Sequence, residues 1–241
     1  MHRFYVDNIE GETASLADAE QLHHLRDVLR LKVNDAVSVS DGTGNDYTGV
    51  ITGITKKQAE IKVKKVKASK KTPIKLTVAC AIPKGSRLDE VIDHLTQLGV
   101  TRIIPMHTER VIVKLDAARA KERVARWQKI ARSAAQQSQR SKIPVIEPVT
   151  DFEDVILGSQ DYDLKLIPNL TGERKLLKDV IAASRPKNII VLIGPEGDFT
   201  PAEVTLALQN GFIPVSLGDT VLRVATAAIA VAAYIKFTVD S

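Results

Sequence analysis

The first part of the chain alternates between hydrophobic and polar residues in short runs that are rich in β-branched side chains. Turn-forming residues separate the runs, most clearly at 41–46. We expect strands at residues 2–6, 36–40, 47–54 and 59–66 and one helix at 17–28. Several short strands in so short a segment predict a small β-barrel or sandwich, which we assign to residues 1–70.

The hydrophobic period changes after residue 74, where apolar runs begin to alternate with helical patterns. The pattern predicts strands at 74–82, 102–105, 163–167, 188–193 and 213–217. It predicts helices at 86–99, 117–139, 175–183, 200–211 and 225–237. Ser86 with Asp89, and Thr200 with Glu203, have the spacing of helix capping boxes. Alternating strands and helices indicate an α/β domain over residues 74–241, with a parallel sheet covered on both faces.

Charge and composition narrow the functional classes. The single cysteine, Cys80, excludes an intrachain disulfide and a thiolate zinc site, and the five histidines lack metal-ligand spacing, so we expect no metal. No apolar run is long enough to cross a bilayer, and the N-terminus lacks a signal-peptide core, so we expect a cytoplasmic protein without membrane contact. Eight lysines lie between Lys56 and Lys71 against one acid, and eleven basic residues lie between Arg102 and Lys142 against three. The two basic blocks favour a polyanionic partner such as RNA over a merely solvated surface.

Glycine-bearing loops follow two of the expected strands. Gly194 and Gly197 follow the strand at 188–193, and Gly218 follows the strand at 213–217. Ligands of open α/β sheets bind at the carboxyl ends of the strands, and glycine permits positive φ and close approach to the backbone. We therefore expect two adjacent strand ends to form a ligand pocket. The chain lacks the dinucleotide fingerprint, the P-loop and the nucleophile elbow, which argues against dinucleotide, triphosphate and serine-hydrolase chemistry.

An ordered set of motifs resembles one known family over nearly the full length. It comprises His2-Arg3-Phe4-Tyr5, His24-Leu25-x-x-Val28-Leu29-Arg30, Lys84-Gly85, Glu109-Arg110-x-x-x-Lys114, Arg126-Trp127, Gln137-Ser138-x-Arg140, Gly194-Pro195-Glu196-Gly197 and Leu217-Gly218-x-x-Val221-Leu222-Arg223-x-x-Thr226. These residues resemble the ribosomal RNA small subunit methyltransferase E family, which belongs to the trefoil-knotted SPOUT methyltransferases. The resemblance implies a knotted C-terminal parallel-sheet domain, an N-terminal PUA-like β-barrel that docks RNA, and a homodimer.

The resemblance also implies an activity: transfer of a methyl group from S-adenosylmethionine to N3 of a uridine in the 16S rRNA of the small ribosomal subunit. By position in the family's motifs, the cofactor would be held by Leu192, Ile193, Gly194, Pro195, Glu196, Gly197, Leu217, Gly218, Val221, Leu222, Arg223 and Thr226. We expect Arg223 to stabilise the developing uracil anion, unless it pairs structurally with an acid such as Glu196. Arg3 and Arg110 are further catalytic candidates. The expected RNA-binding residues are Arg3, Arg26, Arg30, Lys84, Arg110, Lys114 and Arg140.

Three positions depart from the family pattern. Val224-Ala225 stands where the family has Thr-Glu, Asp219-Thr220 where it has Pro-Arg, and Asp198 where glycine is common. These departures keep two alternatives open: a non-catalytic RNA-binding or ribosome-assembly protein of the same fold, and a methyltransferase acting on tRNA.

Overall fold

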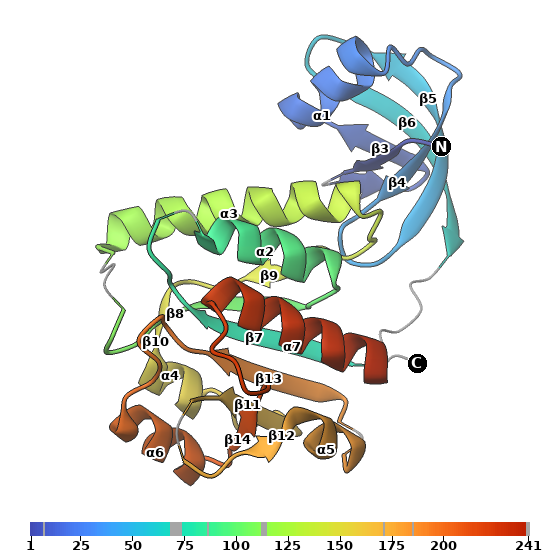
Figure 1. Cartoon of the computed structure of the whole chain (residues 1–241). Coiled ribbons are helices and arrows are strands. Elements are labelled where there is room, and N and C mark those ends of the chain that lie inside the picture. The colour runs from blue at the N-terminus through green and yellow to red at the C-terminus, as the bar shows by residue number, and fades with distance from the viewer. Residues whose placement is uncertain are drawn as a thin grey trace. The chain divides into compact units, whose positions relative to one another are not determined.

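The computed structural model describes residues 1–6, 8–67, 74–85, 87–111, 115–170, 172–184 and 186–239. The chain forms two compact units, drawn together in Figure 1. The N-terminal unit consists of Met1–Lys71 with Ala135–Ile143, and the C-terminal unit consists of Thr72–Ala134 with Pro144–Ser241.

The N-terminal unit is built on a six-stranded sheet with the order β1-β4-β5-β6-β3-β2. Its strands are β1 (Arg3–Tyr5), β2 (Asn8–Glu10), β3 (Thr13–Leu16), β4 (Ala36–Ser40), β5 (Asp46–Ile54) and β6 (Ala59–Lys67). The β1–β4 pair is parallel and the other pairs are antiparallel. Alternate residues of the strands point into one core that includes Phe4, Leu16 and Ile61. The predicted strands are confirmed, whereas the short β2–β3 hairpin was not foreseen.

The helical region of this unit differs from the single expected helix. Asp18 caps α1 (Ala19–His23) by accepting a hydrogen bond from the Gln21 amide. The chain then continues as a π-helical turn, η1 (His24–Val28). A π-helical turn contains one more residue per hydrogen-bonded loop than an α-helix, which a periodicity of 3.6 residues does not reveal.

A segment from much later in the sequence completes the N-terminal unit. Residues 135–143 follow the main body of α3 (Ala117–Gln137) and lie against the loop after β4. The Ile143 amide donates to the Gly42 carbonyl at 3.0 Å, and Lys142 forms a β-bridge with Thr43. Glycine suits position 42, because its φ is +71° and a Cβ there would lie 3.0 Å from Ile143 Cδ1. The fold therefore joins two segments that the sequence pattern assigned to different domains.

The C-terminal unit is an α/β structure with an entirely parallel sheet. Its strands are β7 (Lys75–Ala81), β8 (Arg102–His107), β9 (Val145–Ile146), β10 (Thr150–Asp151), β11 (Leu164–Pro168), β12 (Lys175–Leu176), β13 (Asn188–Ile193) and β14 (Ile213–Ser216). Their order is β10-β8-β7-β13-β11-β14-β12, with β9 paired to β8. The central strand β13 is buried, as the unbroken apolar run at 188–193 predicted.

Helices cover both faces of this sheet (Figure 1). On one face, α4 (Phe152–Leu157) and α6 (Pro201–Gln209) share a core with strand residues such as Ile190 and Leu192. On the other face, α2 (Arg87–Gln97) contacts α7 (Val224–Val239), and α7 also contacts α5 (Leu177–Ala182), β7 and β13. The expected α/β class is confirmed. The strands β9, β10 and β12 and helix α4 were not foreseen, and each has six residues or fewer.

The start of α6 confirms the expected capping box. Thr200 Oγ1 accepts from the Glu203 amide, and Glu203 Oε2 accepts from the Thr200 amide at 2.8 Å. The other expected cap, at Ser86, lies outside the described residues. None of the helices in the described part of the chain combines the length and apolar character needed to span a membrane.

Candidate functional site

A cleft opens at the carboxyl ends of three neighbouring strands of the C-terminal unit. It contains about 610 Å³ of space between atoms, part of which is open solvent. We define the cleft by its lining residues: Pro168, Asn169, Leu170, Arg174, Ile193, Gly194, Pro195, Glu196, Asp198, Leu217, Gly218, Thr220, Val221, Leu222, Val224 and Ala227. They come from the loops after β11, β13 and β14 and from the first turn of α7.

The strand order corrects one part of the sequence prediction. We expected the two glycine-bearing loops to follow adjacent strands, but β11 lies between β13 and β14 and pairs with both. Long-range strand order is set by how the crossovers pack, which local periodicity does not encode. The loop after β11 therefore becomes a third wall of the cleft.

The cleft brings together eight of the twelve residues predicted to hold the cofactor. These are Ile193, Gly194, Pro195, Glu196, Leu217, Gly218, Val221 and Leu222. The other four do not line it: Leu192 is buried beneath it on β13, Gly197 lies in the same loop, and Arg223 and Thr226 are exposed near the start of α7. Seven of the eight lie in the loops after β13 and β14, and Ile193 is the last residue of β13.

The three glycines have different roles. Gly218 has a φ of +116°, and a Cβ built on it would meet no atom within 4 Å, so its surface faces open space. Gly194 and Gly197 do not have positive φ, contrary to the reason we gave for them. A Cβ on Gly194 would lie 3.0 Å from the Phe199 ring, so this glycine permits ring packing instead. Of the three, only Gly218 has a backbone conformation that favours glycine.

Asp198 has the left-handed conformation that glycine usually adopts, with a φ of +59°. Its amide donates to the Pro195 carbonyl at 3.0 Å, which closes the turn. Its carboxylate Oδ2 accepts from the Leu170 amide at 2.9 Å. Because Leu170 follows β11 and Asp198 follows β13, this hydrogen bond ties two walls of the cleft together.

Arg223 and Glu196 do not pair, although the sequence left that possibility open. Glu196 Oε1 instead lies 3.5 Å from Arg87 Nη1, at the start of α2, and both side chains are about half exposed. The structure shows no hydrogen bond or ion pair of the Arg223 side chain with any other described residue. The Arg223 carbonyl accepts from the Ala227 amide at 2.8 Å and begins α7. The Arg223 guanidinium is therefore available to a ligand or substrate beside the cleft.

Arg110 contacts the loop after β13. Its Nη1 donates to the Gly197 carbonyl at 2.6 Å and to the Phe199 carbonyl at 3.4 Å. A Cβ on Gly197 would lie 3.4 Å from Arg110 Cδ, so the arginine stem packs closely over that glycine. We infer that Arg110 supports the loop that forms one wall of the cleft.

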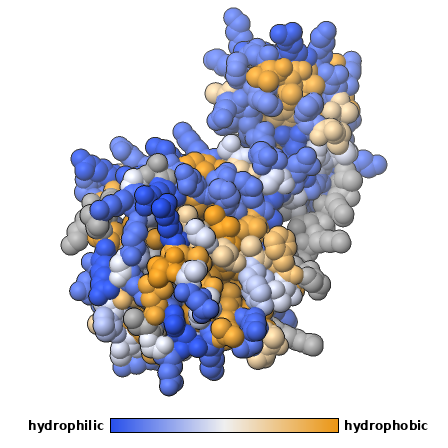
Figure 2. Space-filling model, in the orientation of Figure 1, coloured by the Kyte–Doolittle hydropathy of each residue, from blue (hydrophilic) through white to orange (hydrophobic). Residues whose placement is uncertain are grey.

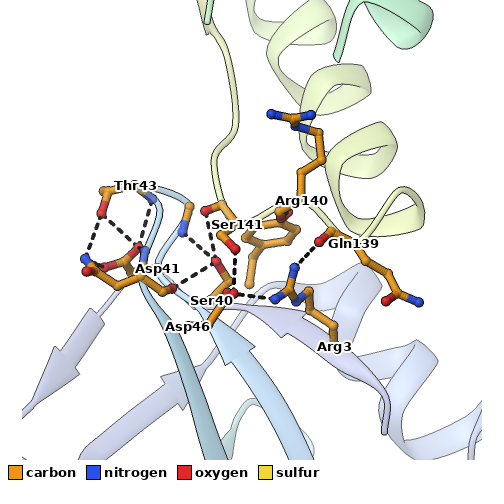
Figure 3. A network of polar contacts seen from close by, with 11 residues as sticks. Arg3, Ser40, Asp41, Thr43, Asp46, Gln139, Arg140 and Ser141 are labelled. Atoms are coloured by element: carbon orange, nitrogen blue, oxygen red, sulfur yellow. Dashed lines mark hydrogen bonds and ion pairs between the residues drawn. The ribbon is translucent and has the colours of Figure 1, made fainter. Parts of the chain in front are cut away.

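Arg3 belongs to a polar network in the N-terminal unit (Figure 3). Its Nη2 lies 2.7 Å from Asp46 Oδ1, and its Nη1 donates to the Gln139 carbonyl. Asp46 Oδ2 also accepts from the Ser141 hydroxyl at 2.6 Å. Only 15% of the Arg3 side chain is exposed, so the geometry favours a structural role, joining β1 to the 139–141 segment, over substrate contact.

The remaining predicted RNA-binding residues are spread over both units. Arg26 is exposed and forms two hydrogen bonds of 2.8 Å with Asp27. Hydrogen bonds from Arg26 and then His23 lower the pKa of Asp27 to about 2. Arg30 is exposed in a left-handed conformation, with a φ of +54°. Lys84 is also exposed, and the Arg140 side chain points away from the network of Figure 3. Lys114 lies outside the described residues.

The lone cysteine lies on β7 and is fully buried. Burial raises the pKa of the Cys80 thiol to about 12, and the negative charge of Glu196 adds to the effect. A thiol with this pKa stays protonated near neutral pH and is a poor nucleophile. No group of three or more potential metal-ligating side chains occurs within the described ranges. The cleft thus offers backbone groups, apolar surface and a few charges.

Sequence reasoning missed the loop after β11. Asn169, Leu170 and Arg174 line the cleft from this loop, and Thr220 lines it from the loop after β14. One signal was present, because the strand expected at 163–167 ends directly before Pro168. Applying the strand-end rule to every strand, including those without a glycine-rich loop, would have found it.

Comparisons with known proteins agree with this architecture. A family model described as an RNA methyltransferase domain matches residues 70–236, and an RNA methyltransferase PUA domain matches residues 16–64. The ribosomal RNA small subunit methyltransferase E of Synechocystis is 34% identical over 98% of this chain and 76% of its own length. The Bacillus subtilis protein of the same name is 29% identical over 94% of this chain and 93% of its own length.

A solved structure adds a match in three dimensions. Ribosomal RNA small subunit methyltransferase E from Neisseria gonorrhoeae, bound to S-adenosyl methionine, has a TM-score of 0.85 and 31% identity. The match covers 98% of this chain and 97% of that chain. A family match over most of the sequence, together with full-length relatives at this identity, leads to one conclusion: the chain belongs to the ribosomal RNA small subunit methyltransferase E family.

Proposed function

We propose that this chain transfers a methyl group from S-adenosylmethionine to N3 of a uridine in the 16S rRNA of the small ribosomal subunit. The observation that carries the proposal is the three-loop cleft, which occurs in a chain that resembles the Neisseria gonorrhoeae enzyme bound to S-adenosyl methionine over nearly its whole length. The names of the relatives support small-subunit rRNA as the substrate. The choice of uridine N3 comes from the family resemblance and from the chemistry considered next.

The residues of the cleft fit a nucleoside cofactor. Ile193, Leu217 and Val224 offer apolar contacts suited to an adenine ring, and Gly218 leaves a bare stretch of main chain where a ring could approach. When bound, S-adenosylmethionine supplies an electrophilic methyl group on a sulfonium centre. The protein then has to hold the nucleophilic atom in line with that methyl group and exclude competing arrangements.

The state of Cys80 supports methylation of nitrogen over carbon. A pyrimidine carbon such as C5 becomes nucleophilic after a thiolate adds to the neighbouring position of the ring. The only cysteine in this chain is buried and protonated, so it cannot make that addition. Uridine N3 is a weakly acidic imide nitrogen, and it needs only to lose its proton. A nearby cation stabilises the anion that forms. Arg223 is our candidate for that charge, because it is exposed and lies between Leu222 and Val224, which line the cleft.

Replacing Arg223 tests this role. We expect Arg223→Ala to lower kcat by about 100-fold, because one preorganised donor to a developing anion has roughly that effect. The affinity for S-adenosylmethionine should stay within about threefold, since Arg223 does not line the cleft. The kcat of Arg223→Lys should lie between those of wild type and Arg223→Ala, because lysine keeps the charge and lacks the planar guanidinium. Single-turnover methylation and calorimetry measure the two effects separately. A loss of affinity without a loss of turnover would identify Arg223 as a structural residue.

The function itself is tested with small subunits from a strain that lacks this protein. Adding the purified chain and labelled S-adenosylmethionine should introduce one methyl group into 16S rRNA, at N3 of a uridine, as located by mass spectrometry of nuclease digests. Purified tRNA serves as the competing substrate, and preferential labelling of it would support the tRNA alternative. Absence of any cofactor binding in calorimetry would support the non-catalytic alternative, which Val224-Ala225 motivates.

The proposal includes a homodimer and a knotted C-terminus. An uncharged face of α7 is exposed at Thr226, Ala230, Tyr234 and Phe237, and Figure 2 shows apolar side chains gathered over this helix. An exposed apolar face of this kind supports self-association, so analytical ultracentrifugation should give twice the 26.3 kDa of one chain. The placement of β11 between β13 and β14, with α7 returning to contact β7 and β13, supports threading of the chain.

A further inference from the structure

Arg174 lines the cleft from the wall that the sequence did not foresee. Its Nη1 donates to the Asn169 carbonyl at 3.1 Å, at the end of β11. Arg174 directly precedes β12, which is held by parallel pairing of Lys175 with Val215 on β14. The backbone on one side of Arg174 is therefore fixed by the sheet, and its side chain is steadied by one hydrogen bond. A guanidinium has five N–H donors, so several remain for a ligand.

The charges around the cleft single out Arg174. Among the described residues that line it, Arg174 is the only cation, beside the two acids Glu196 and Asp198. Glu196 faces Arg87 at 3.5 Å, and Asp198 accepts from the Leu170 amide. The structure shows no acid paired with the Arg174 guanidinium among these residues. A ligand that enters the cleft with a carboxylate finds one matching partner there.

We propose that Arg174 binds the carboxylate at the amino-acid end of the cofactor. The assignment rests on the proposed function, because S-adenosylmethionine carries a carboxylate on its methionyl part and a nucleoside at its other end. A planar guanidinium matches a carboxylate through two parallel hydrogen bonds, which a lysine cannot reproduce. Arg174 thus selects for the amino-acid end, while the apolar and main-chain groups hold the nucleoside.

The test compares two ligands that differ in the group Arg174 recognises. S-adenosylhomocysteine contains the amino-acid carboxylate, and 5′-methylthioadenosine lacks the whole amino-acid end. By calorimetry, Arg174→Gln should lower the affinity for S-adenosylhomocysteine by about 10- to 100-fold. It should change the affinity for 5′-methylthioadenosine by less than about twofold. Arg174→Lys should lie between wild type and Arg174→Gln for S-adenosylhomocysteine. Lys178→Gln, an exposed change on α5 that does not line the cleft, is the matched control and should change neither affinity.

The outcomes separate this assignment from the proposed function. An equal loss of affinity for both ligands in Arg174→Gln would show that Arg174 only supports the loop, and it would overturn the assignment. An unchanged affinity for S-adenosylhomocysteine would overturn it as well. Either result would leave the function intact, because wild-type protein would still bind the cofactor. Wild-type protein that binds neither ligand would overturn the function and the role of Arg174 together. Circular dichroism of each variant checks that the fold is retained.

Discussion

Gly218→Val should lower the affinity for S-adenosylmethionine by at least about 100-fold. Gly218 has a φ of +116°, where β-branched residues are strained by roughly 1–3 kcal/mol. A valine there would also place two methyl groups in the space that the bare main chain leaves in the cleft. Strain and lost space act together, so calorimetry should detect little or no binding in a folded variant.

Gly211→Val provides the matched control for backbone strain. Gly211 also has a positive φ, +81°, and open space around its Cβ position, but it does not line the cleft. We expect a comparable loss of thermal stability with cofactor affinity close to wild type. If both variants bound equally well, or if Gly218→Val kept wild-type affinity while folded, the cleft would not be the cofactor site.

Trp127→Ala should lower the free energy of unfolding by about 3–5 kcal/mol. Trp127 lies on α3 with 1% of its surface exposed, and Ala131 and Ala134 further along the same helix are also buried. Its indole Nε1 donates to Asp89 Oδ1 at 3.0 Å, and Arg126 donates to the other oxygen of the same carboxylate. The alanine variant loses both the packing of a large ring and one of the two partners of Asp89.

Urea unfolding followed by circular dichroism measures this effect, since the variant lacks the only tryptophan of the chain. Trp127→Phe should cost less, because it keeps an aromatic ring and loses only the indole hydrogen bond. Leu157→Ala is a suitable control, because Leu157 is 65% exposed, and it should change stability by no more than about 0.5 kcal/mol. A loss below 1 kcal/mol for Trp127→Ala would mean that α3 contributes little to the core.

The sequence predicted most of the elements that bury an apolar stripe or run. Strand β13 and the capped start of α6 were placed at the observed residues, because an unbroken apolar run and a capping box are local signals. Helix α3 was predicted from its stripe around Trp127 and ends two residues earlier than expected. The hairpin β2–β3 and the strand β12 were missed, because segments of two to four residues carry too little periodicity to be recognised.

The cleft was predicted only in part, because only some of its loops carry a local sequence signal. The loops after β13 and β14 carry glycines and family motifs, and they line the cleft as expected. The loop after β11 carries neither, and its membership depends on β11 pairing with both neighbours, which is a property of the whole sheet. Arg3 illustrates a different limit of the sequence: its motif position suggested substrate contact, and the pairing of its guanidinium with Asp46 becomes visible only in the fold.

Because Cys80 is buried, its reaction with a thiol reagent can report local opening of the parallel sheet. Its sulfur is the only thiol, and it lies on β7, between β8 and β13. A maleimide or disulfide reagent reaches it only when the middle of the sheet separates, so the rate of labelling reports that opening without any engineered probe. Ligands that bind in the cleft at the end of β13 would slow this labelling. The labelling rate of Cys80 therefore measures how much a bound ligand suppresses opening of the sheet.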